Sequence, residues 1–454
     1  MRMSDCGALT RLLRFSICAG AVLLGTGLAG RTASLRGEDW PQWRGPRHDG
    51  VSRESGLPVV WSETAGLAWK CRLPEWGHST PVAAGNAVFV TSQVDEQRLV
   101  LLKIHKTTGR IEWTRDVGTG KAEQIKVHGK NAAERRHQVF PLGENFATPS
   151  PATDGSVIVA HFGNGLLAAY DFDGKPLWKR DLQQDYGAYT VWWGHANSPI
   201  LYQDLVISVC MQETCADLPG KPSPSYVVAH DKHSGREVWL TPRPSASLRE
   251  YSDAYTTPII ANSAGGPLLL VAGAETLDAY APATGKRVWF LPELLGNRMI
   301  ASPVAADGWI YATRGKGGPV LAVKLEGRGQ RPRSDIAWTH EKATPDCPTP
   351  VVCNKLLFWV SNSGIANCLD TVTGEQCWKE RLRGAYRASP LAAQEKIYFV
   401  NTDGMTTVVA AERTFRRLAE NHVEDTIIAS PIASDGKLFL RGQKWLYCLT
   451  KPAR

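Results

Sequence analysis

Short apolar runs alternate with turn residues along most of the chain. Runs rich in β-branched and aromatic residues, such as VFVTS, VIVAH and LLFWV, are separated by residues typical of turns. Such runs, bounded by Gly, Asp, Asn or Pro, are typical of antiparallel strands joined by tight turns. The pattern therefore predicts an all-β chain.

A signature of a small residue followed by proline recurs eight times. Most copies are followed by a turn such as Asp154-Gly155 and then by an apolar run. A fixed unit that repeats in this way indicates a repeat architecture. The copies are centred on Pro81, Pro149 with Pro151, Pro199, Pro258, Pro303, Pro350, Pro390 and Pro431.

A second signature ends most units, with a glycine turn followed by tryptophan four residues later. A unit then contains a strand, a turn, two further strands, a second turn and a last strand ending in Trp. Four antiparallel strands in about 40–50 residues form one blade of a β-propeller. The instances are Gly109 with Trp113, Gly174 with Trp178, Gly235 with Trp239, Gly285 with Trp289, and Gly374 with Trp378.

The two ends of the repeat region complete each other. The eighth unit starts at Pro431 and has room for three strands before Arg454, whereas Leu67-Ala68-Trp69-Lys70 precedes the first unit. Ring closure by this early strand would remove exposed sheet edges. The sequence therefore predicts an eight-bladed propeller over residues 66–454, with strand 66–73 in the last blade.

The recurring tryptophans are expected to cover the gap between neighbouring blades, because a large flat ring buries about 150–250 Å². The seventh unit has Thr414-Phe415-Arg416-Arg417-Leu418 at this place, so this blade is expected to dock more weakly. The predicted docking residues are Trp69, Trp113, Trp178, Trp239, Trp289, Trp338 and Trp378.

The N-terminus is typical of an export signal. Basic residues in 1–14 precede an uncharged run from Phe15 to Gly30, which at about 16 residues is short for a membrane anchor. We therefore predict a signal peptide and spacer over 1–36, a lead-in over 37–65, and no later membrane span. Residues 1–36 hold five of the 52 basic and one of the 44 acidic residues, so the remainder carries a formal charge of only +4. Nucleic-acid binding is not indicated.

Eight cysteines lie beyond residue 36, and their spacing does not predict a zinc site. In an exported protein, Cys210 with Cys215 and Cys353 with Cys368 are candidates for disulfides. The alternative is that the cysteines fill buried strand positions.

The two signatures resemble the quinoprotein propeller repeats, and residues Asp39–Pro46 with Asp49–Ser52 are similar to the lead-in of exported bacterial members. The resemblance implies either an enzyme that binds pyrroloquinoline quinone with calcium, or a non-catalytic scaffold such as the outer-membrane β-barrel assembly lipoprotein. The enzymes of this family have adjacent cysteines over the quinone and a set of calcium ligands. This sequence has no adjacent cysteines, and no such ligand set is recognisable. No cofactor, metal or catalytic residue is therefore predicted, and quinone with calcium stays the alternative.

Residues just before the proline signature should face the central channel, where they would bind a small polar ligand. The alternative is that they hydrogen-bond to the backbone of loops and close the channel with water. Trp76, Trp192 and Trp193 lie beside two of these positions in the sequence. The candidates are His78, Asn145, His195, Tyr255, Arg298, Asp346 and Arg387.

Two insertions break the period, at 118–146 and 211–225, and such long loops are often functional. The leading hypothesis is an exported, non-catalytic propeller that binds an envelope protein or a small polar ligand in the periplasm or at the cell envelope. The alternatives are a quinone-dependent dehydrogenase of alcohols or sugars and a carbohydrate-binding propeller. A monomer is expected.

Overall fold

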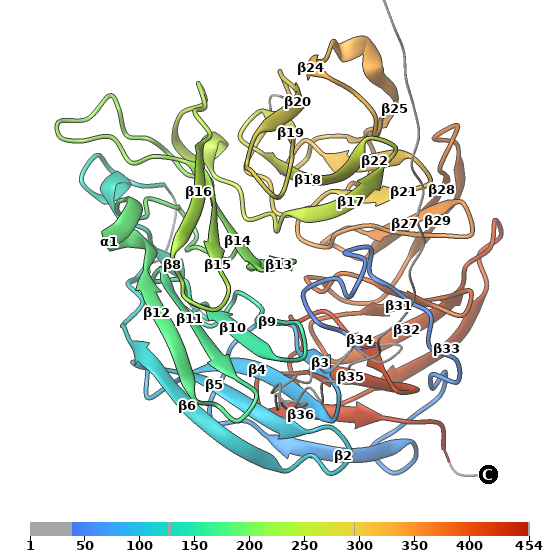
Figure 1. Cartoon of the computed structure of the whole chain (residues 1–454). Helices are drawn as coiled ribbons and strands as arrows, with labels where there is room; N and C mark the ends of the chain where they lie inside the picture. Colours follow the sequence, from blue (N-terminus) through green and yellow to red (C-terminus); the bar gives the residue numbers. More distant parts are fainter. Residues whose placement is uncertain (1–38, 126–128, 295, 453–454) are drawn as a thin grey trace, which may run out of the picture. The chain divides into compact units, whose positions relative to one another are not determined.

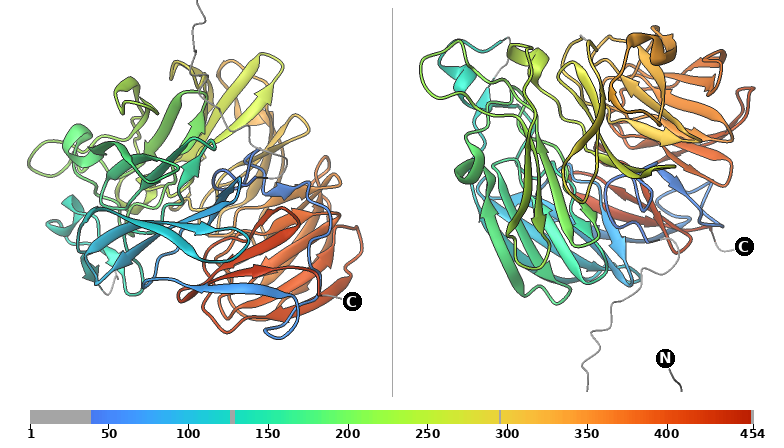
Figure 2. Two further views of the ribbon diagram at one scale, coloured as in Figure 1. Left: turned by 60° about the horizontal axis from the view of Figure 1, so that its bottom comes forward. Right: turned by 45° about the horizontal axis from the view of Figure 1, so that its top comes forward.

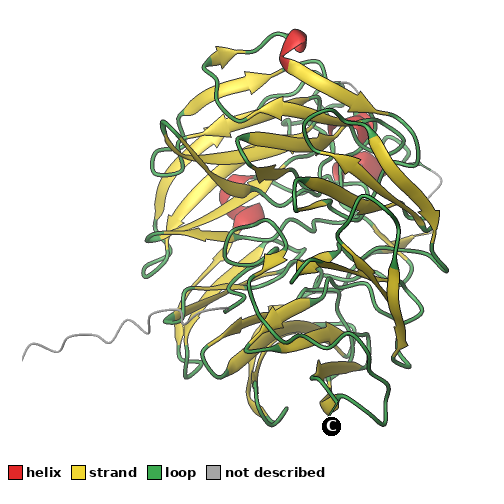
Figure 3. Cartoon of the chain, turned by 90° about the vertical axis from the view of Figure 1, so that its right-hand side faces the viewer, coloured by secondary structure: helices red, strands yellow, loops and turns green. Residues whose placement is uncertain are grey.

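The computed structural model describes residues 39–125, 129–294 and 296–452 (Figure 1). The predicted signal peptide lies outside these residues. Nearly all of the described regular structure is β-sheet (Figure 3). None of the described helices is long and apolar enough to cross a bilayer.

The first four blades each contain four antiparallel strands, and the strand after the proline signature is innermost. The strands of blades 1 and 2 are β3 (Val82–Ala84), β4 (Ala87–Val94), β5 (Arg98–His105), β6 (Ile111–Thr119), β9 (Ala152–Thr153), β10 (Val157–His161), β11 (Leu166–Asp171) and β12 (Pro176–Asp181). Those of blades 3 and 4 are β13 (Ile200–Tyr202), β14 (Leu205–Cys210), β15 (Tyr226–Asp231), β16 (Glu237–Pro242), β17 (Ile259–Ser263), β18 (Gly266–Gly273), β19 (Thr276–Tyr280) and β20 (Arg287–Leu291).

The last four blades repeat this order. The strands of blades 5 and 6 are β21 (Val304–Ala306), β22 (Trp309–Thr313), β23 (Val320–Lys324), β25 (Ile336–His340), β26 (Val351–Cys353), β27 (Leu356–Val360), β28 (Ile365–Asp370) and β29 (Gln376–Arg381). Those of blades 7 and 8 are β30 (Leu391–Ala393), β31 (Lys396–Val400), β32 (Met405–Ala410), β33 (Arg417–His422), β34 (Ile432–Ser434), β35 (Lys437–Arg441), β36 (Trp445–Leu449) and β2 (Leu67–Arg72).

A few short elements lie outside this pattern. β1 pairs in parallel with β30, β24 pairs in parallel with β20, and β7 pairs in parallel with β8 inside the first insertion. Their bounds are β1 (Val51–Ser52), β7 (Gln124–Ile125), β8 (Phe140–Pro141) and β24 (Gly329–Gln330), and the helical segments are α1 (Leu182–Tyr186) and the 3-10 turns Glu134–Arg136, Arg249–Ser252 and Arg333–Asp335.

The predicted ring closure is confirmed. β2 forms the outer strand of blade 8 and pairs antiparallel with β36, with Trp69 opposite Cys448. The eight-bladed propeller predicted from the repeats is therefore the observed fold, and β2 from before the first blade shares one sheet with β36, the last described strand.

The residues before the signature prolines form a circle of hydrogen bonds around the channel, which explains why a small hydroxyl residue recurs there. In each blade, the backbone N–H of the Ser or Thr before proline donates to the side-chain hydroxyl of the equivalent residue in the next blade, at 2.8–3.2 Å. The last bond, from Ser430 to Thr80, closes the circle. We call these residues the hydroxyl ring; they are Thr80, Ser150, Ser198, Thr257, Ser302, Thr349, Ser389 and Ser430.

The repeated tryptophans lie at the seams between blades. Six indole N–H groups donate to a backbone carbonyl in the next blade, at 2.8–3.2 Å. The glycine of the next blade's turn lies against the ring: a Cβ at Gly109 would be 2.6 Å from the Trp69 ring, and the same holds for Gly235 against Trp178. Trp289 differs, because its indole nitrogen has no partner among the described residues and Arg331 lies 4.9 Å from its ring centroid.

Blade 7 has no tryptophan at its seam with blade 8. The strand register puts Ala419 at the position that Trp378 occupies in blade 6, one residue beyond the segment identified from the sequence. Leu57 and Trp61 of the lead-in are buried in the core cluster that includes Tyr398 of blade 7 and Phe439 of blade 8. The weaker docking expected of blade 7 stays a prediction, and the lead-in supplies apolar cover at this seam.

The lead-in also crosses one end of the channel. Trp40 pairs with Ala83 of blade 1, and Pro41 accepts a hydrogen bond from Thr153 of blade 2. The Arg44 guanidinium then donates to the carbonyls of Pro390 and Pro350, at 2.7 Å each, in blades 7 and 6. Figure 2 shows the lead-in in blue beside the C-terminal blades in red.

Neither candidate disulfide is present. All eight cysteines from Cys71 to Cys448 are free, and five of them are buried. Cys353 and Cys368 lie opposite different residues of β27, Leu356 and Phe358 respectively. The cysteines therefore fill strand and loop positions.

Candidate functional site

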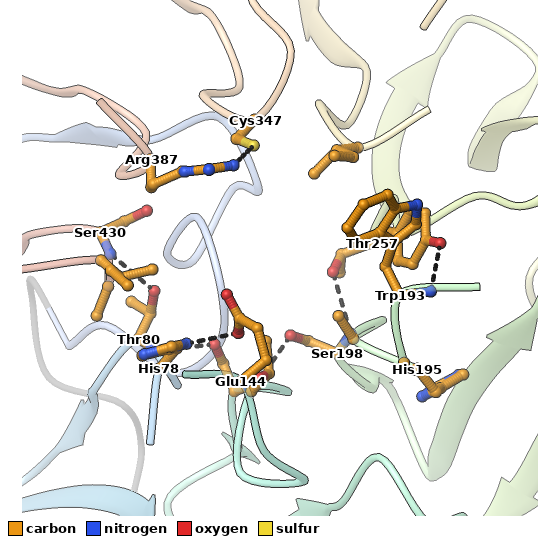
Figure 4. Close-up of a pocket in the computed structure, with 18 of the residues that line it drawn as sticks. His78, Thr80, Glu144, Trp193, His195, Ser198, Thr257, Cys347, Arg387 and Ser430 are labelled. Atoms are coloured by element: carbon orange, nitrogen blue, oxygen red, sulfur yellow. Dashed lines mark hydrogen bonds and ion pairs between the residues drawn. The ribbon is translucent and has the colours of Figure 1, made fainter. Parts of the chain in front are cut away.

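A chamber of about 450 Å³ lies on the channel axis. Seven of the eight ring hydroxyl residues line it, and Trp43 of the lead-in lies at it as well. The first insertion contributes a wall from Phe140 to Leu142 together with Glu144. The chamber is therefore built from the segments that precede the innermost strands, from the lead-in and from one insertion (Figure 4).

His78 and Glu144 form one pair at the chamber. The His78 Nδ1 atom lies 2.8 Å from Glu144 Oε2, while the Nε2 atom of this buried ring has no hydrogen-bond partner in the described part of the chain. His78 precedes the signature of blade 1, whereas Glu144 comes from the first insertion. The pair links two elements that the sequence separates by 66 residues.

Arg298 is the centre of a second group. Its Nη1 atom lies 2.7 Å from Glu250 Oε1, and its Nη2 atom lies 3.5 Å from Asp346 Oδ2. The guanidinium carbon is 5.1 Å from the Trp193 ring, whose indole N–H also donates to Glu250 at 2.7 Å. Burial raises the pKa of Asp346.

Arg387 lies at the chamber with a thiol as its hydrogen-bond partner. Its Nη1 atom is 3.1 Å from Cys347 Sγ, which also accepts from the amide of Asn362 at 3.2 Å. Burial raises the pKa of the Cys347 thiol. The Arg387 side chain is exposed.

A buried carboxyl lies behind Tyr255. The Tyr255 hydroxyl accepts a hydrogen bond from the Trp193 backbone at 3.1 Å and donates to Asp253 at 3.4 Å. Burial raises the pKa of Asp253 and lowers that of Lys130. Lys130 belongs to the first insertion, and its ammonium donates to the carbonyls of Thr190 and Val191 at 2.8 and 3.3 Å, which attaches the insertion to the segment before blade 3.

The two insertions are joined to each other by ion pairs. Arg135 of the first insertion contacts the buried Glu213 and, at 2.8 Å, Asp217 of the second. Arg136 donates to the carbonyls of Leu218 and Pro219 at 2.9 and 2.7 Å. The two long loops therefore form one wall beside the mouth.

Five of the seven residues predicted at the channel line the chamber: His78, His195, Tyr255, Arg298 and Arg387. The His195 ring is fully buried, stacks on Tyr189 at 4.7 Å and bonds to Val209 O at 3.1 Å. Burial lowers the pKa of His195 to about 4.

The other two predicted residues are not among those that line the chamber. The Asn145 side chain bonds to the backbone of Trp76 and Ala147, which is the structural alternative considered for these positions. Asp346 forms an ion pair with Arg298, which does line the chamber.

Sequence reasoning missed Glu144, Glu250, Cys347 and Trp43. Glu144 and Cys347 directly adjoin predicted residues, so a wider window around each signature would have included them. Glu250 lies in a 3-10 turn, and Trp43 reaches the axis from outside the repeats; no periodic signal marks either.

The described residues contain no group of three or more His, Cys, Asp and Glu side chains that could hold a metal ion. The chamber instead offers hydroxyl groups, two guanidinium groups, two histidines and several aromatic side chains. This chemistry suits reversible binding of a polar or anionic group.

A family model described as "Outer membrane protein assembly factor BamB" matches residues 51–155, 141–331 and 330–444. A comparison with curated proteins returns no match. Three solved structures share the fold at low sequence identity. They are BamB from Moraxella catarrhalis (14% identity, TM-score 0.57, covering 85% of this chain and 99% of that one), a europium-containing methanol dehydrogenase (13%, 0.63, 89% and 89%) and the quinohemoprotein alcohol dehydrogenase of Comamonas testosteroni (13%, 0.63, 93% and 82%).

Proposed function

We propose that this chain, which belongs to the family of the outer membrane protein assembly factor BamB, is a non-catalytic propeller that binds a protein partner at the cell envelope. The proposal includes export, for which the support is the signal-like sequence of residues 1–36. One observation carries it: the lead-in crosses one end of the channel, and exposed apolar residues adjoin the other.

Three apolar side chains support a docking surface at the mouth. Leu142 is 66% exposed and lines the chamber, while Leu248 and Tyr251 are 52% and 55% exposed and flank Glu250, the partner of Arg298. We call these three residues the rim. Large exposed apolar side chains that gather beside polar groups are typical of interaction sites.

The alternative is a quinone-dependent dehydrogenase, and the donor set argues against it. Calcium prefers several oxygen ligands, yet Glu144, which lines the chamber, and Glu250 and Asp346, which lie beside it, already pair with His78 or Arg298. The described residues offer no group of three or more His, Cys, Asp and Glu side chains that could hold the ion. These residues do not fit a calcium–quinone centre, so we derive no reaction through one.

Capture of partners from a solubilised envelope fraction tests the proposal. The double variant Leu142→Asp/Tyr251→Asp puts two charges on the rim and should reduce recovery of a specific partner at least about tenfold, because apolar anchors dominate interfaces. Val372→Asp is the control, since Val372 is 59% exposed on an outer turn of blade 6. Equal capture by the double variant and the wild type would contradict docking at the rim.

Reconstitution separates the two functions. The purified chain is incubated with pyrroloquinoline quinone and calcium, and dye-linked oxidation is measured over a panel of alcohols and sugars. We expect no turnover above that of heat-denatured chain. Substrate-dependent dye reduction would overturn the non-catalytic assignment.

A further inference from the structure

The hydroxyl ring leaves its own protons available. Each ring hydroxyl accepts an N–H from the preceding blade, and among the described residues no ring hydroxyl donates a hydrogen bond of its own. Because a hydroxyl is one donor as well as an acceptor, the seven hydroxyls that line the chamber are free to donate there. The chamber is therefore rich in neutral donors.

The acids at the chamber already have partners, and one cation does not. Glu144 is bonded to His78, while Glu250 and Asp346 share Arg298. Arg387 has no carboxylate within ion-pair distance in the described part of the chain, although Glu144 and Asp346 lie within electrostatic reach. Its bond to the Cys347 sulfur uses one donor of a five-donor guanidinium.

Two buried guanidinium groups next to the ring also lack a carboxylate partner among the described residues. Arg44 donates to Pro350, Pro390 and Asp49 carbonyls, and Arg441 donates to Ser79, Thr91 and Ser92. Buried cations are costly unless a negative charge compensates them. Their position, one residue from ring members, favours negative charge in the chamber.

We infer that the chamber binds a small carboxylic acid, with Arg387 as its ion-pair partner and the ring hydroxyls as donors. A guanidinium fork matches a carboxylate in geometry and charge. Ile300, Ile428 and Phe140 also line the chamber, so the acid has a compact apolar body. A phosphate dianion fits less well, because Glu144 borders the same space. This inference goes beyond partner docking, since the acid lies inside the chamber and needs no rim contact.

Matched acids and amides test this inference on the purified chain alone. Binding of benzoate and hexanoate is compared with that of benzamide and hexanamide by calorimetry at constant ionic strength. We expect the acids to bind and the amides not to. Arg387→Gln should weaken binding about tenfold, and Arg387→Lys should weaken it less, because charge is kept while the fork is lost. Arg110→Gln, which changes an exposed arginine on an outer turn, should bind as the wild type does.

Several outcomes would overturn the inference: equal binding of acid and amide, tighter binding of inorganic phosphate than of benzoate, or unchanged affinity in a folded Arg387→Gln variant. A second arm uses an apolar tetrapeptide with a free or an amidated C-terminus. Preference for the free C-terminus identifies a chain end as the source of the carboxylate, and preference for benzoate identifies a free acid. Circular dichroism establishes that each variant is folded.

Discussion

The seams of blade 3 with blade 4 and of blade 7 with blade 8 solve one packing problem in two ways. At the first, Trp239 lies against Gly285 and donates to Pro282, so the repeat supplies both partners. At the second, the repeat supplies only Ala419, and Trp61 arrives from outside the propeller units. A seam between blades needs an apolar side chain to exclude water. This side chain is supplied either by the repeat itself or by a segment outside the repeats.

The difference assigns the lead-in a structural role. Trp61 donates its backbone N–H to Asn421, and Asn421 in turn donates to Val59, which fixes the segment to β33. The same segment reaches Arg44 at the channel. Residues 39–65 are therefore part of the propeller core and not a linker before it.

The largest effect should come from Trp61→Ala. Trp61 is 4% exposed, and truncating a buried Trp costs about 3–5 kcal/mol. We expect a fall of this size in the free energy of unfolding, measured in urea. Val60→Ala, which changes the neighbouring residue of 59% exposure, should be near neutral. A loss under about 1 kcal/mol at Trp61 would mean that the lead-in does not seal this seam.

Acid should destabilise the attachment of the lead-in through His48. Burial lowers the pKa of His48 to about 4, below its usual 6.5. The unfolded chain therefore binds the proton first, so stability present above pH 6.5 is lost as the pH falls towards 4, by up to roughly 3 kcal/mol. His48→Gln should flatten the decline in Tm over this range.

The wild type is the control for this measurement. His195 and His230 also have pKa values lowered to about 4 by burial, and they are present in both proteins. These two rings remain in the variant and maintain part of the slope. An identical slope in wild type and His48→Gln would show that His48 is not buried in its neutral form.

Two glycines with similar backbone conformations test whether a tryptophan seam requires a glycine opposite the indole ring. Gly285 and Gly308 have φ of +68° and +80°, but a Cβ at Gly285 would overlap Trp239, whereas nothing lies within 4 Å at Gly308. Gly308→Ala should cost about 1 kcal/mol of backbone strain, and Gly285→Ala about 2 kcal/mol more through overpacking. Equal losses in thermal unfolding would show that the indole does not need the glycine.

The smallest expected effect is at the hydroxyl ring. Ser302→Ala removes the acceptor for the Thr257 N–H, at 2.8 Å, and should cost about 1 kcal/mol. Ser302→Thr keeps a hydroxyl, as three ring positions already do, and should recover most of this stability. Similar unfolding curves for both variants would contradict the role assigned to the ring.

The repeats predicted the fold because each unit carries its own turn and strand signals. Strand β2 was found by the same reasoning, since the last unit lacked a strand. Trp43 and Trp61 were not identified, because the lead-in has no period and Trp61 meets Asn421 across 360 residues. The seam position of blade 7 lies one residue beyond the segment identified from the sequence, because the connection from β32 to β33 is one residue longer than that from β28 to β29: Val408 faces Ala419, whereas Cys368 faces Trp378.

The sequence predicted which residues lie at the chamber better than it predicted their interactions. The rule that residues before the signature face the axis identified five residues that line the chamber. It could not show that His195 turns into the core or that Arg298 is already paired, because those facts depend on Tyr189 and Glu250 in other units. Partner choice is a tertiary property that local patterns do not encode.

The place of β2 in blade 8 has a consequence for synthesis. The strand that leaves the ribosome early pairs with β36, about 375 residues later in the chain. Until that late segment emerges, β2 and the edge it will cover both remain open to wrong pairing. Maturation of this protein therefore ends with one very long-range contact, and any factor that shields an unpaired strand during translation would act on β2 first.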